Sequence, residues 1–110
     1  MGHFPFFMEI GGKKGMVVGG GRVAARKVEK LLPFGPVLTV IAPRIEDCMR
    51  TLEKRPREHE HGAASLLLEE RAFALEDLSG ADFVIAATDD EALNGRIAEY
   101  CQAVRIPVNV

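Results

Sequence analysis

Three consecutive glycines, Gly19, Gly20 and Gly21, separate a short apolar run from a segment with helical periodicity that begins near Arg22. Together with Ala24 they match the pattern G-x-G-x-x-A. In a strand–turn–helix unit, the first glycine allows a tight turn, the second lets a pyrophosphate approach the backbone, and the small last residue lets helix and strand pack closely. The free N–H groups at the start of the helix also suit a phosphate. The pattern predicts a dinucleotide-binding loop, and a purely structural turn is the alternative.

Apolar strands and helices alternate along the whole chain, which restricts the fold class. Strands that are apolar on both faces are typical of a parallel sheet covered on both sides. The first strand–helix–strand unit, residues 16–42, has the length of a right-handed crossover connection. The sequence therefore predicts an α/β fold, a Rossmann-like parallel sheet with helices on both faces, as a single domain over residues 1–110. The expected strands are 15–18, 37–42, 65–71, 81–87 and 106–110.

Two helix starts carry recognisable signals. Pro43 suits the first position of one helix, and Thr88 with Glu91 has the spacing of a capping box at the start of another. Asn94 lies near the start of that second helix and receives no role. The residues expected on the buried faces of the two helices are Ile45, Met49, Leu52, Leu93, Ile97, Cys101 and Val104.

The end of the second expected strand lacks a common feature of nicotinamide-dinucleotide sites. Such sites usually have an acidic residue about 20 residues after the glycine loop, bonded to the ribose hydroxyls. Here the sequence reads IAPRI, with Arg44 in that neighbourhood and no acid before Glu46. Arg44 suits the 2′-phosphate of NADP, or it is a solvated residue with no ligand. The residues alone leave the choice between NAD and NADP open.

Composition and charge exclude several classes of protein. Apolar residues make up 47% of the 110 residues and charged residues 27%, an ordinary balance for one globular domain. The formal net charge of -2 argues against a general affinity for nucleic acid, whose binders usually carry a basic patch. The N-terminal segment lacks the pattern of a signal peptide, and no run approaches the ~20 apolar residues of a membrane-spanning helix. We expect a cytoplasmic protein that binds neither nucleic acid nor a membrane.

Signals for metal or redox sites are weak. Cys48 and Cys101 fall inside expected helices and form no CxxC pair, so we expect free thiols rather than a disulfide. His59 and His61 lie close together in a charged loop, but a pair of histidines supplies fewer ligands than a metal site needs. A solvated loop is the better interpretation of this segment, and no metal site is predicted.

Three segments together resemble one enzyme family. They read FPFFMEIGGKKGMVVGGGRVAARKVEKLL, LTVIAPRI and ADFVIAATDDEALNGRIAEYCQAVRIPVNV, and they cover nearly the whole chain except the loop at 53–65. The motifs GGGxVAxRK and AATDDxxxN, in this order, resemble those of the N-terminal part of siroheme synthase, the precorrin-2 dehydrogenase module. The resemblance implies a Rossmann domain followed by a dimerisation segment and a small helical domain, in an enzyme that forms a homodimer.

The same resemblance implies a reaction and a cofactor. Members of the family transfer hydride from the tetrapyrrole precorrin-2 to NAD⁺ and form sirohydrochlorin, and some also insert Fe²⁺ as a ferrochelatase. By position, Arg22 and Val23 meet the pyrophosphate and a nearby ribose, and Pro43 and Arg44 line the adenosine end. The family also lacks the usual acid there, which favours NAD over NADP. Thr88 touches the cofactor in this comparison, or it serves only to cap its helix.

The sequence departs from the family pattern at its end. In the family an aspartate follows the last strand within a few residues and is assigned the acid/base role, whereas this chain ends at Val110. Asp89 and Asp90 occupy positions typical of helix caps, so no catalytic residue is assigned. We expect a truncated, cofactor-binding part of the enzyme that is inactive alone. The alternatives are a non-catalytic NAD-sensing domain and a fragment of another NAD(P) dehydrogenase.

Overall fold

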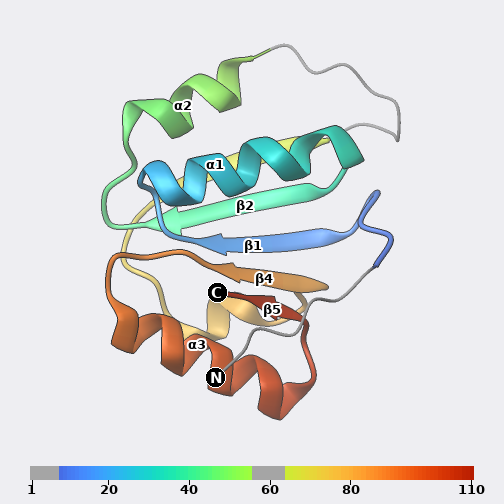
Figure 1. Ribbon diagram of the computed structural model, residues 1–110, viewed down its shortest axis with the longest axis vertical. Coiled ribbons are helices and arrows are strands. Elements are labelled where there is room, and N and C mark those ends of the chain that lie inside the picture. Colours follow the sequence, from blue (N-terminus) through green and yellow to red (C-terminus); the bar gives the residue numbers. More distant parts are fainter. Residues whose placement is uncertain (1–7, 56–63) are drawn as a thin grey trace.

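The apolar runs of the sequence form strands and its periodic segments form helices (Figure 1). The computed structural model describes residues 8–55 and 64–110. The strands are β1 (Lys14–Val18), β2 (Val37–Ala42), β3 (Ser65–Glu70), β4 (Phe83–Ala86) and β5 (Val108–Asn109). The helices are α1 (Arg22–Leu31), α2 (Asp47–Lys54) and α3 (Glu91–Val104), with short 3-10 helices η1 (Leu32–Phe34) and η2 (Leu75–Leu78).

The strands form a five-stranded, entirely parallel sheet in the order β3-β2-β1-β4-β5. β2 and β3 are added in turn on one side of β1, whereas β4 and β5 are added on its other side. The strand order therefore reverses between β1 and β4. This arrangement confirms the predicted α/β class and the Rossmann-like sheet. In open parallel sheets, ligands bind outside the carboxyl ends of the strands at such a reversal.

Alternate residues of each strand point to opposite faces of the sheet and build two separate cores. Val17 packs with residues of α1 and α2 on one face, whereas Val18 packs with residues of α3 and η2 on the other. Figure 1 shows α1 and α2 on one side of the sheet and α3 on the other. The prediction of helices on both faces is therefore confirmed.

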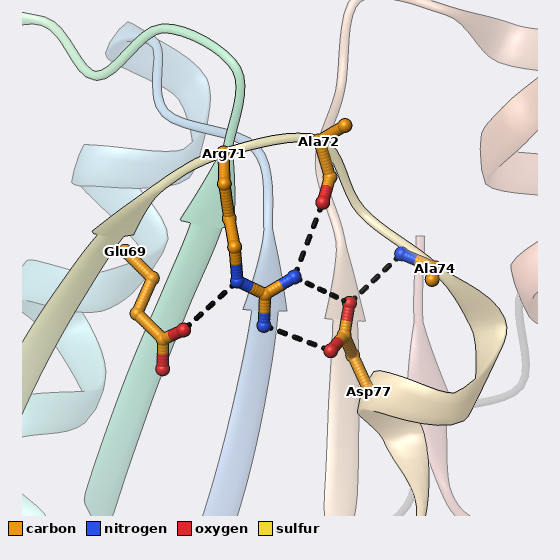
Figure 2. Close-up of polar contacts among 5 residues, drawn as sticks. All are labelled: Glu69, Arg71, Ala72, Ala74 and Asp77. Carbon is orange, nitrogen blue, oxygen red and sulfur yellow. Dashed lines mark hydrogen bonds and ion pairs between the residues drawn. The ribbon is translucent and has the colours of Figure 1, made fainter.

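The connection from β3 to β4 contains the short helix η2, and Arg71 fixes its shape (Figure 2). The Arg71 Nε donates to Glu69 Oε1 at 3.0 Å, and its Nη2 donates to Asp77 Oδ1 at 2.8 Å. Its Nη1 donates to the carbonyl of Ala72 at 3.1 Å and to the second oxygen of Asp77 at 3.0 Å. Asp77 also accepts the backbone N–H of Ala74 at 2.8 Å. The Arg71 guanidinium lowers the pKa of the Asp77 carboxyl.

The helix start predicted at Pro43 is wrong. Pro43 lies in a bend, and α2 begins only after Glu46, its N-cap. The backbone N–H of Ile45 donates to Glu70 Oε2 at 2.9 Å. The N–H of Glu46 donates to the carbonyl of Gly20 at 2.9 Å. Because these bonds to distant parts of the chain hold the segment in a non-helical form, the helix starts about one turn later than its local pattern suggests.

The predicted buried stripe of the last helix is wrong at its end. Ile97 and Cys101 are buried as expected, but Val104 is 46% exposed. The helix ends there, and the chain reverses at Arg105, whose φ is 62°. Ile106, the next residue but one, is partly buried and packs against the core on this face.

Within residues 8–55 and 64–110, no helix is long and apolar enough to span a membrane. The same residues contain no group of three or more His, Cys, Asp or Glu side chains that could hold a metal ion. Cys48 and Cys101 are free thiols, and burial raises the pKa of Cys101. His59 and His61 lie outside the described residues.

Candidate functional site

The glycine loop that follows β1 packs closely against the loop that follows β4. Gly19 has a φ of 132°, which side chains rarely allow. A Cβ built on it would collide with the carbonyl oxygen of Ala87. Its N–H donates to the carbonyl of Ile41 at 3.0 Å. The fold itself therefore requires glycine at this position.

Gly20 faces the loop that follows β2. A Cβ at Gly20 would collide with the carbonyl oxygen of Arg44, and the Gly20 carbonyl accepts the N–H of Glu46. The segment that carries the predicted site residues Pro43 and Arg44 thus lies directly against the glycine loop. Both of these residues are exposed, so they can reach a ligand bound at this edge of the sheet.

Gly21 differs from the two glycines before it. Its φ of -95° and ψ of -165° are open to any residue. Among the described residues, a Cβ built on Gly21 meets only Glu46 Oε2, at 3.0 Å, and that atom is the end of a flexible side chain. The fold alone does not require glycine here. The position fits the glycine of the motif whose missing side chain lets a ligand approach the backbone.

The first turn of α1 has the features of an anion-binding helix start. Gly21 is the N-cap and supplies no side-chain hydrogen bond, and the first turn holds no acidic residue. The N–H groups of this turn therefore lack a side-chain cap and carry the positive end of the helix dipole. Arg22 is exposed beside them, and Val23 is 60% exposed. A cation and an apolar surface at an uncapped helix start suit the phosphates and ribose of a nucleotide.

The loop after β4 is held by a buried asparagine to which the sequence motifs assigned no role. Asn94 is only 9% exposed. Its Oδ1 accepts the backbone N–H of Thr88 at 3.1 Å and the Thr88 hydroxyl at 2.7 Å. Its Nδ2 donates to the Thr88 carbonyl at 3.0 Å. The signal that could have identified it is a polar residue between Leu93 and Ile97 on the buried face of the helix.

The prediction that Thr88 and Glu91 form a capping box is wrong. The N-cap of α3 is Asp90, whose Oδ1 accepts the N–H of Leu93 at 3.1 Å. Thr88 lies outside the helix, where its hydroxyl bonds to Asn94 and accepts the N–H of Asp90 at 3.1 Å. The bonds to Asn94 hold Thr88 in the loop, so Asp90 is left to cap the helix.

The loop between β2 and α2 is fixed by the end of β3. Glu70 Oε2 accepts the N–H of Ile45 at 2.9 Å and forms an ion pair with Arg50 at 3.1 Å. The hydrogen bond from Ile45 is the largest cause of the lowered pKa of Glu70, and the charges of Arg50 and Arg44 also lower it. The ionised carboxylate thereby anchors the segment that carries Pro43 and Arg44.

The predicted binding positions lie in the loops that follow β1, β2 and β4 and, for Arg22 and Val23, in the first turn of α1. These segments meet at the carboxyl end of the parallel strands. Gly19 packs on the β4 loop beside Thr88, and Gly20 packs on the β2 loop at Arg44. These segments flank the point between β1 and β4 at which the strand order reverses. A parallel sheet of this order, with a glycine loop leading into an uncapped helix at the reversal, defines a dinucleotide-binding domain of the Rossmann type.

A comparison with known families agrees with this class. A family model described as "Putative NAD(P)-binding" matches residues 6–110. The chain belongs to this NAD(P)-binding family. The prediction of a nicotinamide dinucleotide as the cofactor class is thereby confirmed at the level of the family.

Individual relatives confirm the resemblance seen in the motifs. The siroheme synthase of Nitrosospira multiformis is 44% identical over 110 residues, which are 100% of this chain and 22% of that protein. The siroheme synthase of Ectopseudomonas mendocina is 43% identical over the same shares. A solved structure named SirC, precorrin-2 dehydrogenase, matches with a TM-score of 0.76 and 25% identity, over 98% of this chain and 49% of that one. The chain thus spans 22% of the length of these curated relatives.

Proposed function

We propose that this chain binds NAD⁺ and serves as the cofactor-binding domain of an enzyme that oxidises precorrin-2. The observation that carries the proposal is the similarity to siroheme synthases over the whole chain, joined by the structural match to a precorrin-2 dehydrogenase. The edge at which the loops after β1, β2 and β4 meet supports it, because a dinucleotide needs contacts to its pyrophosphate and to both of its nucleosides.

The glycine loop and the start of α1 form the proposed pyrophosphate site. Gly21 leaves the backbone open to the ligand, and the N–H groups of the first turn donate to the phosphate oxygens. Arg22 adds a positive charge, and Val23 packs against the nearby ribose. Gly19 and Gly20 contribute by holding the loop against its neighbours.

The two neighbouring loops complete the proposed site. Pro43 and Arg44 line the adenosine end, and Thr88 contacts the cofactor from the β4 side. Asn94 holds Thr88 in place through three hydrogen bonds. When bound, NAD⁺ accepts the hydride that the tetrapyrrole loses. The homodimer, the insertion of Fe²⁺ and the cytoplasmic location stay predictions for the whole protein.

Calorimetric titration of the chain with NAD⁺, and separately with NADP⁺, tests the cofactor part of the proposal. We expect saturable binding with a preference for NAD⁺. An absence of heat with either dinucleotide up to about millimolar concentration, where the binding free energy is only ~4 kcal/mol, would contradict a working dinucleotide site.

The substrate part is tested with the full-length encoded protein. We expect NADH to form, as followed by its absorbance, only when both NAD⁺ and precorrin-2 are present. Simple alcohols in place of the tetrapyrrole serve as the control. NADH formation from the alcohols and not from precorrin-2 would assign the domain to a different NAD-dependent dehydrogenase.

A further inference from the structure

The usual position of the ribose-binding acid is apolar in this chain. In Rossmann domains this carboxylate stands at the end of the second strand and accepts hydrogen bonds from the adenosine ribose. Here β2 ends at Ala42 and Pro43 follows. Neither residue can accept a hydrogen bond through its side chain, so a carboxylate at this edge must come from elsewhere.

Glu46 brings a carboxylate to the glycine loop from the other end of the β2–α2 connection. A methyl group built on Gly21 would lie 3.0 Å from Glu46 Oε2. The carboxylate therefore borders the space that the missing side chain of Gly21 leaves open. This space is where the pyrophosphate and the adjoining adenosine ribose approach the backbone in domains with this motif.

The backbone of Glu46 is tied to the same loop, so the closeness of the carboxylate does not depend on its side-chain rotamer alone. The N–H of Glu46 donates to the Gly20 carbonyl at 2.9 Å. Glu46 itself is extended, with φ -80° and ψ 162°, and precedes the first turn of α2. The neighbouring Ile45 is buried and anchored to Glu70. The backbone that carries the carboxylate is thus fixed on both sides.

The carboxylate of Glu46 has spare hydrogen-bonding capacity. It makes no side-chain cap to α2. Across residues 8–55 and 64–110, no hydrogen bond or ion pair engages its oxygens. The pKa of Glu70 is lowered chiefly by the hydrogen bond from Ile45, then by Arg50, and to a smaller extent by the charge of Arg44. Arg44, the other charged residue of this loop, therefore lies near Glu70. An acceptor for hydroxyl groups is therefore available beside Gly21.

We infer that Glu46 accepts hydrogen bonds from the adenosine ribose hydroxyls and makes this site select NAD over NADP. The inference rests on the proposed NAD⁺ site. A carboxylate bonds well to the two hydroxyls of a ribose, because both are donors and its oxygens only accept. The 2′-phosphate of NADP replaces one of these donors by negative charge, which the carboxylate repels. Specificity is thus supplied from the start of α2 instead of the end of β2.

The test compares Glu46→Gln with Asp47→Asn by calorimetric titration with NAD⁺ and NADP⁺. Asp47 is the adjacent exposed acid and serves as the matched loss of one negative charge. We expect Glu46→Gln to weaken NAD⁺ binding about ten-fold, the size of a hydrogen bond to a charged group. NADP⁺ binding should not weaken, because the variant removes the charge that repels the 2′-phosphate. The ratio of the two affinities then falls in Glu46→Gln and stays unchanged in Asp47→Asn.

A second probe needs no variant. The analogue of NAD⁺ that lacks the 2′-hydroxyl of the adenosine ribose should bind the unaltered chain more weakly than NAD⁺. It should lose little further affinity in Glu46→Gln, since the analogue already lacks the hydroxyl whose hydrogen bond to the carboxylate the variant weakens. Additive losses, or an unchanged NAD⁺ to NADP⁺ ratio in Glu46→Gln, would overturn the role of Glu46 while leaving the dinucleotide site intact. Absence of binding by the unaltered chain would instead overturn the proposed function, and this inference with it.

Discussion

Three adjacent glycines do different things at the residue scale. Gly19 and Gly20 are required because backbone of the neighbouring loops fills the space that a side chain would need. Within the part of the chain that the structure describes, Gly21 has no such neighbour, and only a carboxylate oxygen of Glu46 borders it. The first two glycines are thus required by packing, whereas the third is the one that we propose faces the ligand.

Gly21→Ala should separate binding from folding. The added methyl group occupies the proposed path of the pyrophosphate, so we expect NAD⁺ affinity to fall about ten-fold or more, ~1.4 kcal/mol. The loss of stability should be at most about 1 kcal/mol, because the one unfavourable effect expected on the fold is that alanine is a poorer N-cap than glycine. Calorimetry and thermal melting measure the two effects.

The matched control is Gly95→Ala. Gly95 is exposed in α3, and no atom of the described residues outside the helix backbone lies within 4 Å of a Cβ built there. We expect unchanged NAD⁺ affinity and a slight gain in stability, since alanine is the better helix former by about 1 kcal/mol. Equal NAD⁺ affinities in the two variants would show that Gly21 does not face the cofactor.

Asn94→Ala should cost both stability and cofactor binding. The substitution leaves the N–H and carbonyl of Thr88 without their partner, which typically costs about 1–3 kcal/mol for a buried group. Gln102→Ala, on an exposed position of the same helix, should change stability by less than about 0.5 kcal/mol. Urea unfolding measures the stability of the two variants, and calorimetric titration with NAD⁺ measures their cofactor binding. A cost for Asn94→Ala no larger than that of the control would mean that the bonds to Thr88 contribute nothing to stability.

Local sequence patterns indicated the candidate site residues but did not reveal their contacts. The glycine motif and the segment around Arg44 were identified from spacing, and the structure brings them together. The partner of Thr88 could not be read from the capping pattern, because Asp90 can cap the same helix equally well. Asn94 determines which residue caps the helix, because its hydrogen bonds to Thr88 hold Thr88 in the loop, and these bonds form only in the folded chain.

At the scale of whole elements, uniform runs were predicted well and connections were not. The six β-branched and apolar residues of β2, Val37–Ala42, match the expected strand at both ends. The start of α2 was misplaced because hydrogen bonds to Glu70 and Gly20 override the local preference of Pro43 for a helix start. Such bonds join segments far apart in the chain, so spacing within one segment does not reveal them.

The β3–β4 connection is expected to depend on Arg71. Arg71→Ala removes four hydrogen bonds to Glu69, Ala72 and Asp77 and should lower the melting temperature by a few degrees. Arg50→Ala is the control, because Arg50 and Glu70 form a single pair in which both side chains are about half-exposed. Exposed pairs contribute little. A control that melts as low as Arg71→Ala would contradict a special role for the Arg71 network.

The whole molecule should lose stability in acid. The pKa of Asp77 is lowered from 3.8, chiefly by Arg71, and that of Glu70 from 4.5, chiefly by Ile45. A carboxyl whose pKa is lower in the folded state stabilises the protein above its unfolded pKa, and this contribution disappears as pH falls through the folded value. The melting temperature should therefore decrease as the pH is lowered below about 5. Arg71→Ala should fall less steeply, and an identical pH profile would contradict the pairing.

Cofactor binding should stabilise the entire fold, because the three loops of the site belong to strands on both sides of the sheet reversal. NAD⁺ at about 100 times its dissociation constant adds ~2.7 kcal/mol to the free energy of unfolding. For a domain of this size the melting temperature should then rise by about 10 °C. The increase should shrink in Gly21→Ala at the same NAD⁺ concentration, and an equal increase would place binding elsewhere.

The most direct test of the site is a map of backbone amide shifts on ¹⁵N-labelled chain during titration with NAD⁺. We predict that the largest shifts cluster in the glycine loop and first turn of α1, in the segment from Pro43 to Glu46, and around Thr88. These segments lie far apart in the sequence and meet only at the sheet reversal. Large shifts confined to other surfaces, or no shifts at NAD⁺ concentrations that saturate related domains, would contradict a dinucleotide site at this edge.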